Sequence, residues 1–451
     1  MKIFNNLTRQ LEDFIPIHSN RVNIYTCGPT VYDHSHIGHA RSCMTWDMVY
    51  RYFKHKKYQV TWIRNITNID DKIVKRALEA NSSPDKLSRE FTYEFWADMH
   101  ALNISWPDLE PRATDYLIEM FAFIQELIDK NFAYVTKNGD VYFRVHKHVN
   151  YGQLKRQSLE QLAEGISRVD ENELKESQLD FALWKAFARE PETSFNSPWG
   201  IGRPGWHLEC STMIKAILNS QNLGDTLDIH AGGDDLIFPH HENECAQSEC
   251  LSGKALAKYW MHNGMVMVNG SKMSKSEGNF FTIKDLLAIY KPNTIRYFCL
   301  STHYKKQINF GHEALEAAEQ GFDKLVKFLE TPSDEPLNQE LIQAFENAMD
   351  NDFNSAQALA LIFENKDNKN IPTLIFLLKI LGFDLNNQET TANNEKSEAA
   401  LAQVMDLVLD LRKTIRENKD FVTSDKIREA LSKAGINVKD YRDKASEWEL
   451  N

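Results

Sequence analysis

Apolar residues form short clusters and helical repeats along the first part of the chain. Residues 22–26 form an apolar run typical of a buried strand, and helical spacing follows from about 37 to 53. A second strand pattern covers 59–64 and is followed by a helix from about Asp71. Alternation of strands and helices predicts a parallel α/β sheet.

The pattern changes between about residues 110 and 200. Helical spacing runs from 112 to 131, and two strand patterns at 133–136 and 140–143 then flank Asn138-Gly139. An Asn-Gly pair between two such runs predicts a β-hairpin. The hairpin interrupts the α/β alternation, so we expect an insertion between two halves of the sheet.

The α/β pattern resumes near Gly205. Strand patterns at 227–230 and 265–268 continue it, and the chain is helical and charged from about 311. Residues 385–398 contain few apolar positions and are typical of a linker. The fold class is therefore α/β, with a split parallel-sheet domain followed by a helical bundle and a small C-terminal domain.

Composition narrows the class of protein. The chain has 451 residues, which indicates roughly two to four domains, and its 42% hydrophobic and 26% charged residues are typical of a globular protein. The longest apolar stretch, 371–383, contains Pro372 and Lys379 and is shorter than the ~20 residues of a membrane span. The N-terminus lacks a signal-peptide pattern, so we expect a cytoplasmic protein.

Charge and cysteine content restrict the partners. With 52 basic and 64 acidic residues the net charge is −12, which does not favour nucleic acid as a partner. It does not exclude one either, because phosphate binding needs only a local basic patch. The 6 cysteines are too sparse for a disulfide scaffold, so we expect free thiols, some of them metal ligands.

The first candidate site is the motif His-Ile-Gly-His at 36–39, directly after a strand and a turn. A helix N-terminus offers unpaired N–H groups to an anion, and Gly38 lets a flat ring or a phosphate approach the backbone. His36 and His39 can donate hydrogen bonds to phosphate oxygens whose charge grows in a transition state.

The second candidate site is the segment Lys-Met-Ser-Lys-Ser at 272–276, which is flanked by Gly270 and Gly278. A loop with two ammonium groups, on Lys272 and Lys275, can stabilise a leaving pyrophosphate. The chain has no Walker-type P-loop motif, so this loop is the best phosphate-binding candidate in the sequence.

Cysteine and histidine residues indicate a metal site. Cys27, Cys210 and the segment 240–245 (His-His-Glu-Asn-Glu-Cys) supply ligands suited to Zn²⁺. On a helix, His240/Glu244 and His241/Cys245 are both i, i+4 pairs on one face. Ligand softness favours the pair His241/Cys245, and spacing alone leaves both alternatives open.

The two phosphate motifs, in this order and far apart, resemble the signature pair of class I aminoacyl-tRNA synthetases. Four further segments are similar to cysteinyl-tRNA synthetases: Tyr-Thr-Cys-Gly-Pro-Thr-Val-Tyr-Asp at 25–33, Asn-Ile-Thr-Asn-Ile-Asp-Asp-Lys at 65–72, Arg-Pro-Gly-Trp-His-Leu-Glu-Cys at 203–210 and Phe-Pro-His-His-Glu-Asn-Glu at 238–244. The resemblance extends from about residue 1 to 385.

This resemblance implies an organisation into domains. It implies a Rossmann-like catalytic domain at 1–110 and 201–310, split by a connective insertion at 111–200. A helical tRNA-binding domain at 311–385 and a small anticodon-binding domain at 399–451 would follow. The expected molecule is a monomer that acts on L-cysteine, ATP and tRNA(Cys), forms cysteinyl-adenylate with release of pyrophosphate, and transfers cysteine to the 3′ end of the tRNA.

The resemblance also implies the roles of individual residues. One Zn²⁺ per chain would be held by Cys27, Cys210, His240 and Glu244. Its open coordination position would select the cysteine thiolate, because an apolar pocket alone distinguishes near-isosteres poorly. His36, His39, Lys272 and Lys275 would act in catalysis with Mg²⁺ bound to ATP. Nucleotide-binding residues would be Gly38, Gly232, Gly233, Asp235 and Lys275, and cysteine-binding residues would be Thr67, Trp206 and His230.

Two other functions remain open at the level of sequence. An ATP-dependent cysteine ligase of the mycothiol pathway resembles the same catalytic domain but transfers cysteine to an amino sugar; the long helical part after 311 favours a tRNA acceptor. A non-catalytic zinc-binding or tRNA-binding protein is disfavoured by the intact His36, His39, Lys272 and Lys275.

Overall fold

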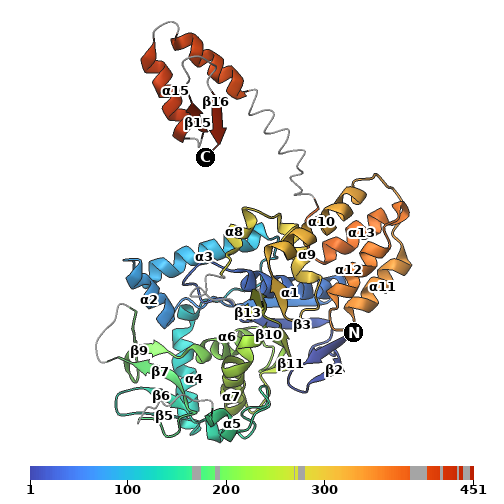
Figure 1. Ribbon diagram of the computed structural model, residues 1–451. Helices are drawn as coiled ribbons and strands as arrows, with labels where there is room; N and C mark the ends of the chain where they lie inside the picture. The colour runs from blue at the N-terminus through green and yellow to red at the C-terminus, as the bar shows by residue number, and fades with distance from the viewer. Residues whose placement is uncertain are drawn as a thin grey trace. The chain divides into compact units, whose positions relative to one another are not determined.

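Figure 1 shows the computed structural model, which describes residues 1–164, 174–187, 193–268, 270–272, 280–385, 404–416, 420–433, 436–439 and 447–450. The chain divides into two compact units, Met1–Asp384 and Leu385–Asn451. Among the described helices, none has both the length and the apolar character that a membrane span requires.

A four-stranded parallel sheet lies at the centre of the first unit. Its order is β11-β10-β3-β4, and the strands are Ala257–Asn263, Leu227–Gly233, Arg21–Thr26 and Gln59–Arg64, respectively. The strands predicted at 22–26 and 59–64 are confirmed, and β10 continues to Gly233, beyond the prediction. Strand β11 is not predicted by the sequence analysis. Parallel strands end at a common edge, so the residues that follow β3, β4 and β10 meet there.

Five helices of this unit matter for that edge. They are α1 (Ile37–His55), α2 (Asp71–Glu79), α3 (Pro84–Ala101), α6 (Trp206–Ser220) and α7 (Glu242–Ser252). Helix α1 follows β3 and is fixed at its far end, where Tyr52 donates a hydrogen bond of 2.7 Å to Asp350 and His55 contacts Glu346 at 2.8 Å. In its middle, buried Asp47 pairs with buried Arg296 at 2.8 Å. These contacts hold α1, which begins at that edge of the sheet, against later helices of the same unit.

The predicted insertion carries its own sheet. The predicted hairpin is confirmed as β5 (Ala133–Val135) and β6 (Val141–Phe143), paired Ala133 to Phe143. The five-stranded antiparallel sheet has the order β5-β6-β7-β9-β8, with β7 (Phe181–Ala186), β8 (Phe195–Ser197) and β9 (Gly200–Pro204). Helices α4 (Leu117–Asp129) and α5 (Leu159–Glu164) belong to the same region.

The strand predicted at 265–268 exists but lies outside the parallel sheet. As β12 (Val266–Val268) it pairs with β13 (Ser271–Lys272) and β14 (Ile308–Phe310) in a separate sheet. An N-terminal hairpin is formed by β1 (Lys2–Asn5) and β2 (Gln10–Asp13). The remaining helices of the unit are α8 (Ile283–Leu287), α9 (Pro292–Leu300), α10 (His312–Leu329), α11 (Gln339–Met349), α12 (Ser355–Glu364) and α13 (Ile371–Ile380).

The second unit is small. It contains a helix at 404–416, α15 (Phe421–Lys433) and an antiparallel pair of strands, β15 (Ile436–Lys439) and β16 (Glu447–Leu450). Met405, Ile436 and Val438 form its core. Within it, Arg412 is buried and donates to the carbonyl of Ser424. The basic residues Lys413, Arg416, Lys426 and Arg428 lie on its two described helices.

Candidate active site

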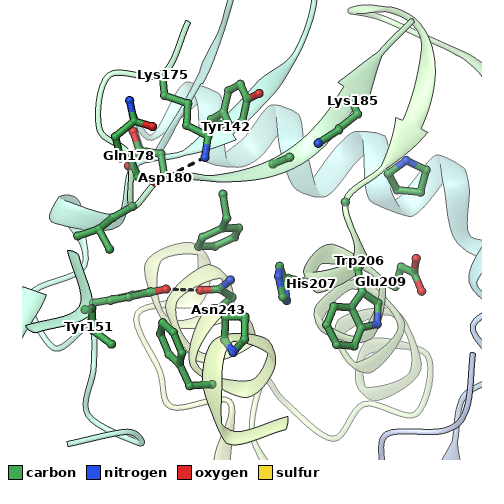
Figure 2. Close-up of a pocket in the computed structure, with 18 of the residues that line it drawn as sticks. Tyr142, Tyr151, Lys175, Gln178, Asp180, Lys185, Trp206, His207, Glu209 and Asn243 are labelled. Atoms are coloured by element: carbon green, nitrogen blue, oxygen red, sulfur yellow. Dashed lines mark hydrogen bonds between the residues drawn. The ribbon is translucent and has the colours of Figure 1, made fainter. Parts of the chain in front are cut away.

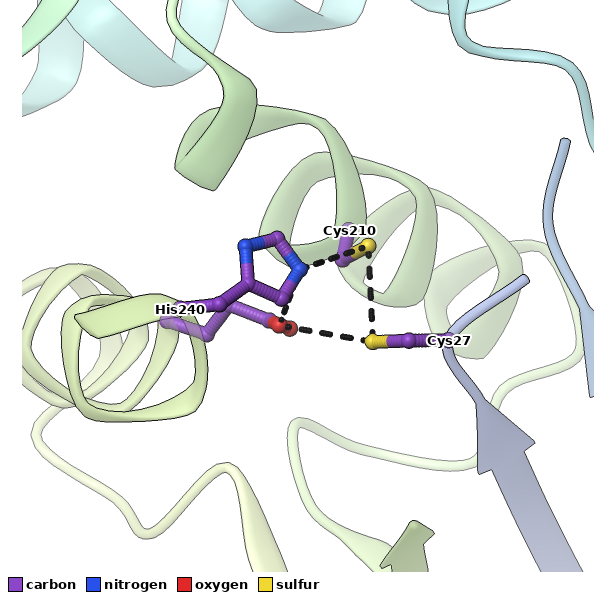
Figure 3. A group of neighbouring side chains, drawn as sticks. Cys27, Cys210 and His240 are labelled. Atoms are coloured by element: carbon purple, nitrogen blue, oxygen red, sulfur yellow. Dashed lines mark hydrogen bonds and ion pairs between the residues drawn. The ribbon is translucent and has the colours of Figure 1, made fainter. Parts of the chain in front are cut away.

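Four predicted metal ligands from three regions of the chain meet at the end of the parallel sheet. Cys27 follows β3, Cys210 lies in the first part of α6, and His240 and Glu244 flank the junction of a short π-helical turn, η5 (Ile237–His241), with α7. Their ligand atoms all lie within 4.8 Å of one another. Figure 3 shows the Cys27, Cys210 and His240 side chains pointing toward one another.

The distances within this group, called the metal cluster below (Cys27, Cys210, His240 and Glu244), are short enough for one ion to contact all four side chains. The two sulfur atoms lie 3.9 Å apart, and Cys210 Sγ lies 3.6 Å from His240 Nε2. Glu244 Oε1 lies 3.0 Å from His240 Nε2 and 3.6 Å from Cys27 Sγ. Cys210, His240 and Glu244 are 2%, 1% and 0% exposed.

Burial and mutual contacts shift the ionisation of these groups. The hydrogen bond from Cys27 lowers the pKa of Cys210 to about 6. Burial alone would raise the pKa of Glu244, but His230 and His240 hold it well below its usual value. Burial would likewise lower the pKa of His240, and Glu244 instead raises it to about 10. Two thiols, an imidazole and a carboxylate in close contact form a donor set that suits a tetrahedral Zn²⁺.

The structure distinguishes between the two alternative pairs of ligands. Cys245 points away from the metal cluster, with its sulfur 3.5 Å from both Glu249 Oε1 and Gln153 Nε2. The pair His241/Cys245 is therefore not brought together. His241 does lie beside the cluster, with Nε2 3.3 Å from Cys27 Sγ and Nδ1 2.7 Å from His262 Nε2. Cys27, His230, His241 and Glu244 form a second overlapping group of possible ligands.

The three predicted cysteine-binding residues take different positions around the metal cluster. Trp206 stacks on His240 with ring centroids 4.2 Å apart and is 38% exposed. Thr67 is buried and donates to Glu209 Oε2 at 3.2 Å. His230 is fully buried behind the cluster, where Nε2 contacts Glu244 Oε2 at 2.8 Å. Of the three, Trp206 alone lines the adjoining cleft.

That cleft, called the nucleotide cleft below, has a volume of about 350 Å³ and extends from Cys27 to the start of α1. His36, Gly38, His39, Gly233 and Asp235 line it. The cleft therefore brings together the predicted phosphate-binding motif and three of the predicted nucleotide-binding residues, Gly38, Gly233 and Asp235. The cleft is large enough for a nucleotide and adjoins the metal cluster at Cys27.

The two histidines of the motif cap the helix that they begin. His36 Nδ1 accepts from the Gly38 N–H at 3.1 Å, and His39 Nδ1 accepts from the His36 N–H at 3.2 Å. Their rings stack with centroids 3.8 Å apart. Burial lowers the pKa of His39 to about 4, so this imidazole is neutral at neutral pH. With Nδ1 occupied as an acceptor, the proton of His39 is on Nε2, where it can be donated.

Two glycines end β10 in close contact with their neighbours. A Cβ on Gly232 would lie 2.9 Å from the His241 ring, and one on Gly233 would lie 2.5 Å from Asp235 Oδ1. Gly233 and Asp235 line the nucleotide cleft, whereas Gly232 faces the histidines behind it. Side chains at these positions would displace the His241 ring or the Asp235 carboxylate.

Sequence reasoning missed two residues of the site. Lys72 lines the nucleotide cleft from the first turn of α2, where Asp70 caps the helix at 2.7 Å. Asn65 accepts from the Gly28 N–H at 2.9 Å and donates to Thr67 at 3.3 Å, so it joins the Cys27 turn to the Thr67 strand end. Both belong to the segment 65–72, which directly follows the strand predicted at 59–64. This position at the end of a parallel strand is the signal that could have indicated them.

The predicted lysine loop cannot be placed in the same way. Lys272 ends β13, but its side chain and residues 273–279, with Lys275, lie outside the described residues.

A second cavity of about 720 Å³ lies between the insertion and helices α6 and α7. Figure 2 shows side chains from both sides pointing into it, among them Tyr142, Lys185 and Trp206. Its lining mixes aromatic rings with charged groups of both signs. Trp206 lines this cavity and the nucleotide cleft, so the two adjoin at that ring.

Comparison with known proteins places the chain among relatives. Residues 13–320 match the family model of the class I (C) tRNA synthetase catalytic domain, and residues 344–370 match the DALR domain. A cysteine–tRNA ligase of Streptococcus agalactiae serotype III (strain NEM316) is 44% identical over 98% of each chain. One of Hydrogenovibrio crunogenus (strain DSM 25203 / XCL-2) is 45% identical over 98% of this chain and 97% of that protein.

A solved structure shares the fold. Mycobacterium tuberculosis methionyl-tRNA synthetase in complex with methionyl-adenylate superposes with a TM-score of 0.59 over 80% of this chain and 90% of that chain, at 14% identity.

Proposed function

The chain belongs to the cysteine–tRNA ligase family of class I tRNA synthetases, and from this premise we propose how its residues carry out that reaction. The enzyme activates L-cysteine with ATP to cysteinyl-adenylate and pyrophosphate, and then transfers cysteine to the 3′ end of tRNA(Cys). The observation that carries the proposal is the position of a buried sulfur-containing metal cluster beside a nucleotide-sized cleft.

The metal cluster would hold one Zn²⁺ through Cys27, Cys210, His240 and Glu244. Bound zinc supplies strong and selective affinity for a thiolate, which serine cannot match. Cys210 is buried and its pKa is already lowered, which fits a thiolate ligand. His230 supports these ligands because its Nε2 contacts Oε2 of Glu244, the carboxylate oxygen that does not face His240. Such a bond fixes the orientation of a ligating carboxylate.

Trp206 and Thr67 would complete the pocket for cysteine. Trp206 covers the His240 ring and reaches both cavities, so it can close the pocket on the side of the substrate. Thr67 is tied to Glu209 and Asn65 at the base. The substrate thiol would face the metal cluster, and its carboxylate would then face the nucleotide cleft.

In the activation step a cysteine carboxylate oxygen attacks the α-phosphorus of ATP, and the bond to pyrophosphate breaks. Gly38 lets the phosphates approach the start of α1, and His36 and His39 donate hydrogen bonds to them. Lys275, assisted by Lys272, would neutralise the leaving pyrophosphate, with Mg²⁺ on the ATP. Positioning and charge stabilisation of this kind dominate phosphoryl chemistry.

The nucleoside would lie toward the end of β10. Gly233 leaves room for the adenosine, Gly232 keeps the backbone close to His241, and Asp235 would accept hydrogen bonds from the ribose hydroxyls. Lys72 lines the same cleft and would contribute to phosphate binding.

The transfer step needs access for the unpaired 3′ end of the tRNA. The second cavity adjoins the reaction centre at Trp206 and carries rings and basic groups that suit unpaired nucleotides. Lys185 is exposed at its edge. The helical region at 311–385 and the C-terminal unit would contact other parts of the tRNA.

Charging of total tRNA with labelled cysteine, in the presence of ATP and Mg²⁺, tests the proposal. The expected result is label bound to tRNA through an ester. Cysteine-dependent pyrophosphate exchange without charging of tRNA would keep the activation step and reject the acceptor. An amino sugar would then be tested as the acceptor.

A further inference from the structure

Two residues between the metal ligands face away from the metal cluster. In the segment 240–244, His240 and Glu244 point into the cluster, whereas Glu242 and Asn243 are equally buried, at 0% and 2% exposure, and contact the insertion. A buried carboxylate needs strong partners to offset the loss of water. The partners of Glu242 lie more than 80 residues earlier in the chain.

Glu242 is bound by three backbone N–H groups of one loop. Oε1 accepts from Gly152 at 2.8 Å, and Oε2 accepts from Leu154 at 2.9 Å and from Lys155 at 3.1 Å. Hydrogen bonds from N–H groups to a carboxylate are stronger than neutral ones. The loop is shaped for this role, because Gly152 has a φ of +95° and a Cβ there would lie 2.1 Å from the carbonyl oxygen of Gln157.

Asn243 is bound by the same loop. The Tyr151 hydroxyl donates to Asn243 Oδ1, as the dashed line in Figure 2 shows. Leu154, at the other end of the contact, is fully buried in the apolar core that also contains Cys210 and Cys245. The loop at 151–155 therefore contacts both the backbone turn that carries two metal ligands and the core around a third.

From this geometry we propose that Glu242 and Asn243 are positioning residues. They tie the turn that carries His240 and Glu244 to the insertion and thereby hold those ligands at the 3.0 Å separation observed. The insertion would thus set the affinity of the metal cluster for zinc and, through it, the affinity for cysteine. The effect on zinc affinity is inferred from the metal cluster alone, and the effect on cysteine affinity rests on the proposed function.

The chain offers a matched control on the same helix. Glu249 of α7 also binds the insertion, through His148 at 2.9 Å and Gln153 at 3.3 Å, but it lies further along the helix from the metal ligands. Glu249→Gln would weaken the contacts to His148 and Gln153 while leaving in place the three N–H hydrogen bonds to Glu242. Glu242→Gln replaces one of the two carboxylate oxygens by an NH2 group, which cannot accept a hydrogen bond from the loop.

The test measures zinc affinity on the full chain, by competition with a chromogenic chelator, together with the KM for cysteine and for ATP in pyrophosphate exchange. We expect Glu242→Gln to weaken zinc binding by roughly 10- to 100-fold, the range that follows the loss of a group that orients metal ligands. The KM for cysteine would rise while that for ATP stays within about twofold. Glu249→Gln would bind zinc like the wild type.

Unchanged zinc affinity in Glu242→Gln would overturn the inference, and so would equal losses in both variants, because these indicate general loosening. If Glu242→Gln does not fold, Tyr151→Phe decides, since it removes one hydroxyl at nearly constant volume. A severalfold loss of zinc affinity would support the inference and no loss would overturn it. Charging by the wild type tests the proposed function separately, so the two failures are distinguishable.

Discussion

The metal cluster and the nucleotide cleft adjoin at Cys27 but are built in different ways. The cluster takes its ligands from segments separated by up to 217 residues and buries three of them at 2% exposure or less. The cleft is formed by the turn after β3, the start of α1 and the residues at the ends of β10 and β11, and it keeps a volume of about 350 Å³. Closely packed side chains fill the first region, whereas the second leaves an open space.

This difference fits the task that we propose for each region. Cysteine and serine differ by a single atom, so their discrimination needs fixed ligands that bind sulfur directly. ATP is large and bears its charge on phosphates, so its binding depends on backbone N–H groups, small residues and cations around an open space. Substitutions in the two regions should therefore fail in different ways.

The largest effect is expected in the metal cluster. Cys210→Ser replaces a thiolate ligand by a hydroxyl, which binds zinc poorly. Zinc content should fall far below that of the wild type, and preference for cysteine over serine should be lost with it. Metal analysis and pyrophosphate exchange with both amino acids measure this.

Cys250→Ser serves as the control, because Cys250 is a half-buried thiol outside the cluster. Full zinc content in Cys210→Ser would remove Cys210 from the ligand set.

A smaller and purely kinetic effect is expected for the phosphates. Lys275→Ala should fold and bind zinc normally but activate cysteine more slowly, by roughly 10²-fold or more if Lys275 stabilises the leaving group. Pyrophosphate exchange at saturating cysteine and ATP measures it, with Lys254→Ala, a surface ion-pair variant, as the control. An unchanged exchange rate would exclude Lys275 from the mechanism.

The two regions also differ in how far the sequence predicts them. The motif at 36–39 and the helix after it follow from local order, because a strand, a turn and helical spacing define a helix start. Its mutual capping by His36 and His39 does not follow, since it depends on ring orientation. Spacing left two ligand pairs open in the cluster. Cys245 lies against Glu249 because of tertiary packing, and this packing cannot be predicted from helical periodicity alone.

The fold shows the same limit. The strands at 22–26 and 59–64 are short apolar runs between turns and were predicted. Strand β11 was not, because its sequence ends in His262 and Asn263, which look like surface residues. Both are buried through specific hydrogen bonds: His262 contacts His241 at 2.7 Å and Asn6 at 2.6 Å, and Asn263 accepts from Ser42 at 2.9 Å. The strand at 265–268 could be predicted from its local pattern. Its place in a separate sheet could not, because strand pairing depends on tertiary contacts.

Acid should weaken the fold through buried neutral histidines. Burial lowers the pKa of His39 from 6.5 to about 4 and that of His262 from 6.5 to about 3. Below pH 6.5 the unfolded chain binds protons that the folded chain does not, so stability falls as the pH drops from 6.5 toward these values. Urea unfolding between about pH 7.5 and 5 measures it.

His39→Asn should make this fall shallower by removing one of the groups. A dependence as steep as that of the wild type would contradict the burial of a neutral His39.

The smallest effect is expected at the edge of the second cavity. Lys185→Ala should slow transfer to tRNA by a few-fold, because a single exposed contact to phosphate contributes little and is weakened by salt. Formation of cysteinyl-adenylate should not change. Single-turnover transfer at two salt concentrations, compared with pyrophosphate exchange, measures it. Equal slowing of both steps would place Lys185 outside the path of the tRNA.

The central claim is that the substrate is recognised by its sulfur at the metal cluster. Replacement of zinc by cobalt makes this contact visible, because a thiolate bound to Co²⁺ produces charge-transfer absorption. Addition of cysteine to the cobalt-loaded enzyme should increase that absorption, while serine should leave the spectrum unchanged. A spectrum that does not respond to saturating cysteine would contradict direct binding of the substrate sulfur to the metal.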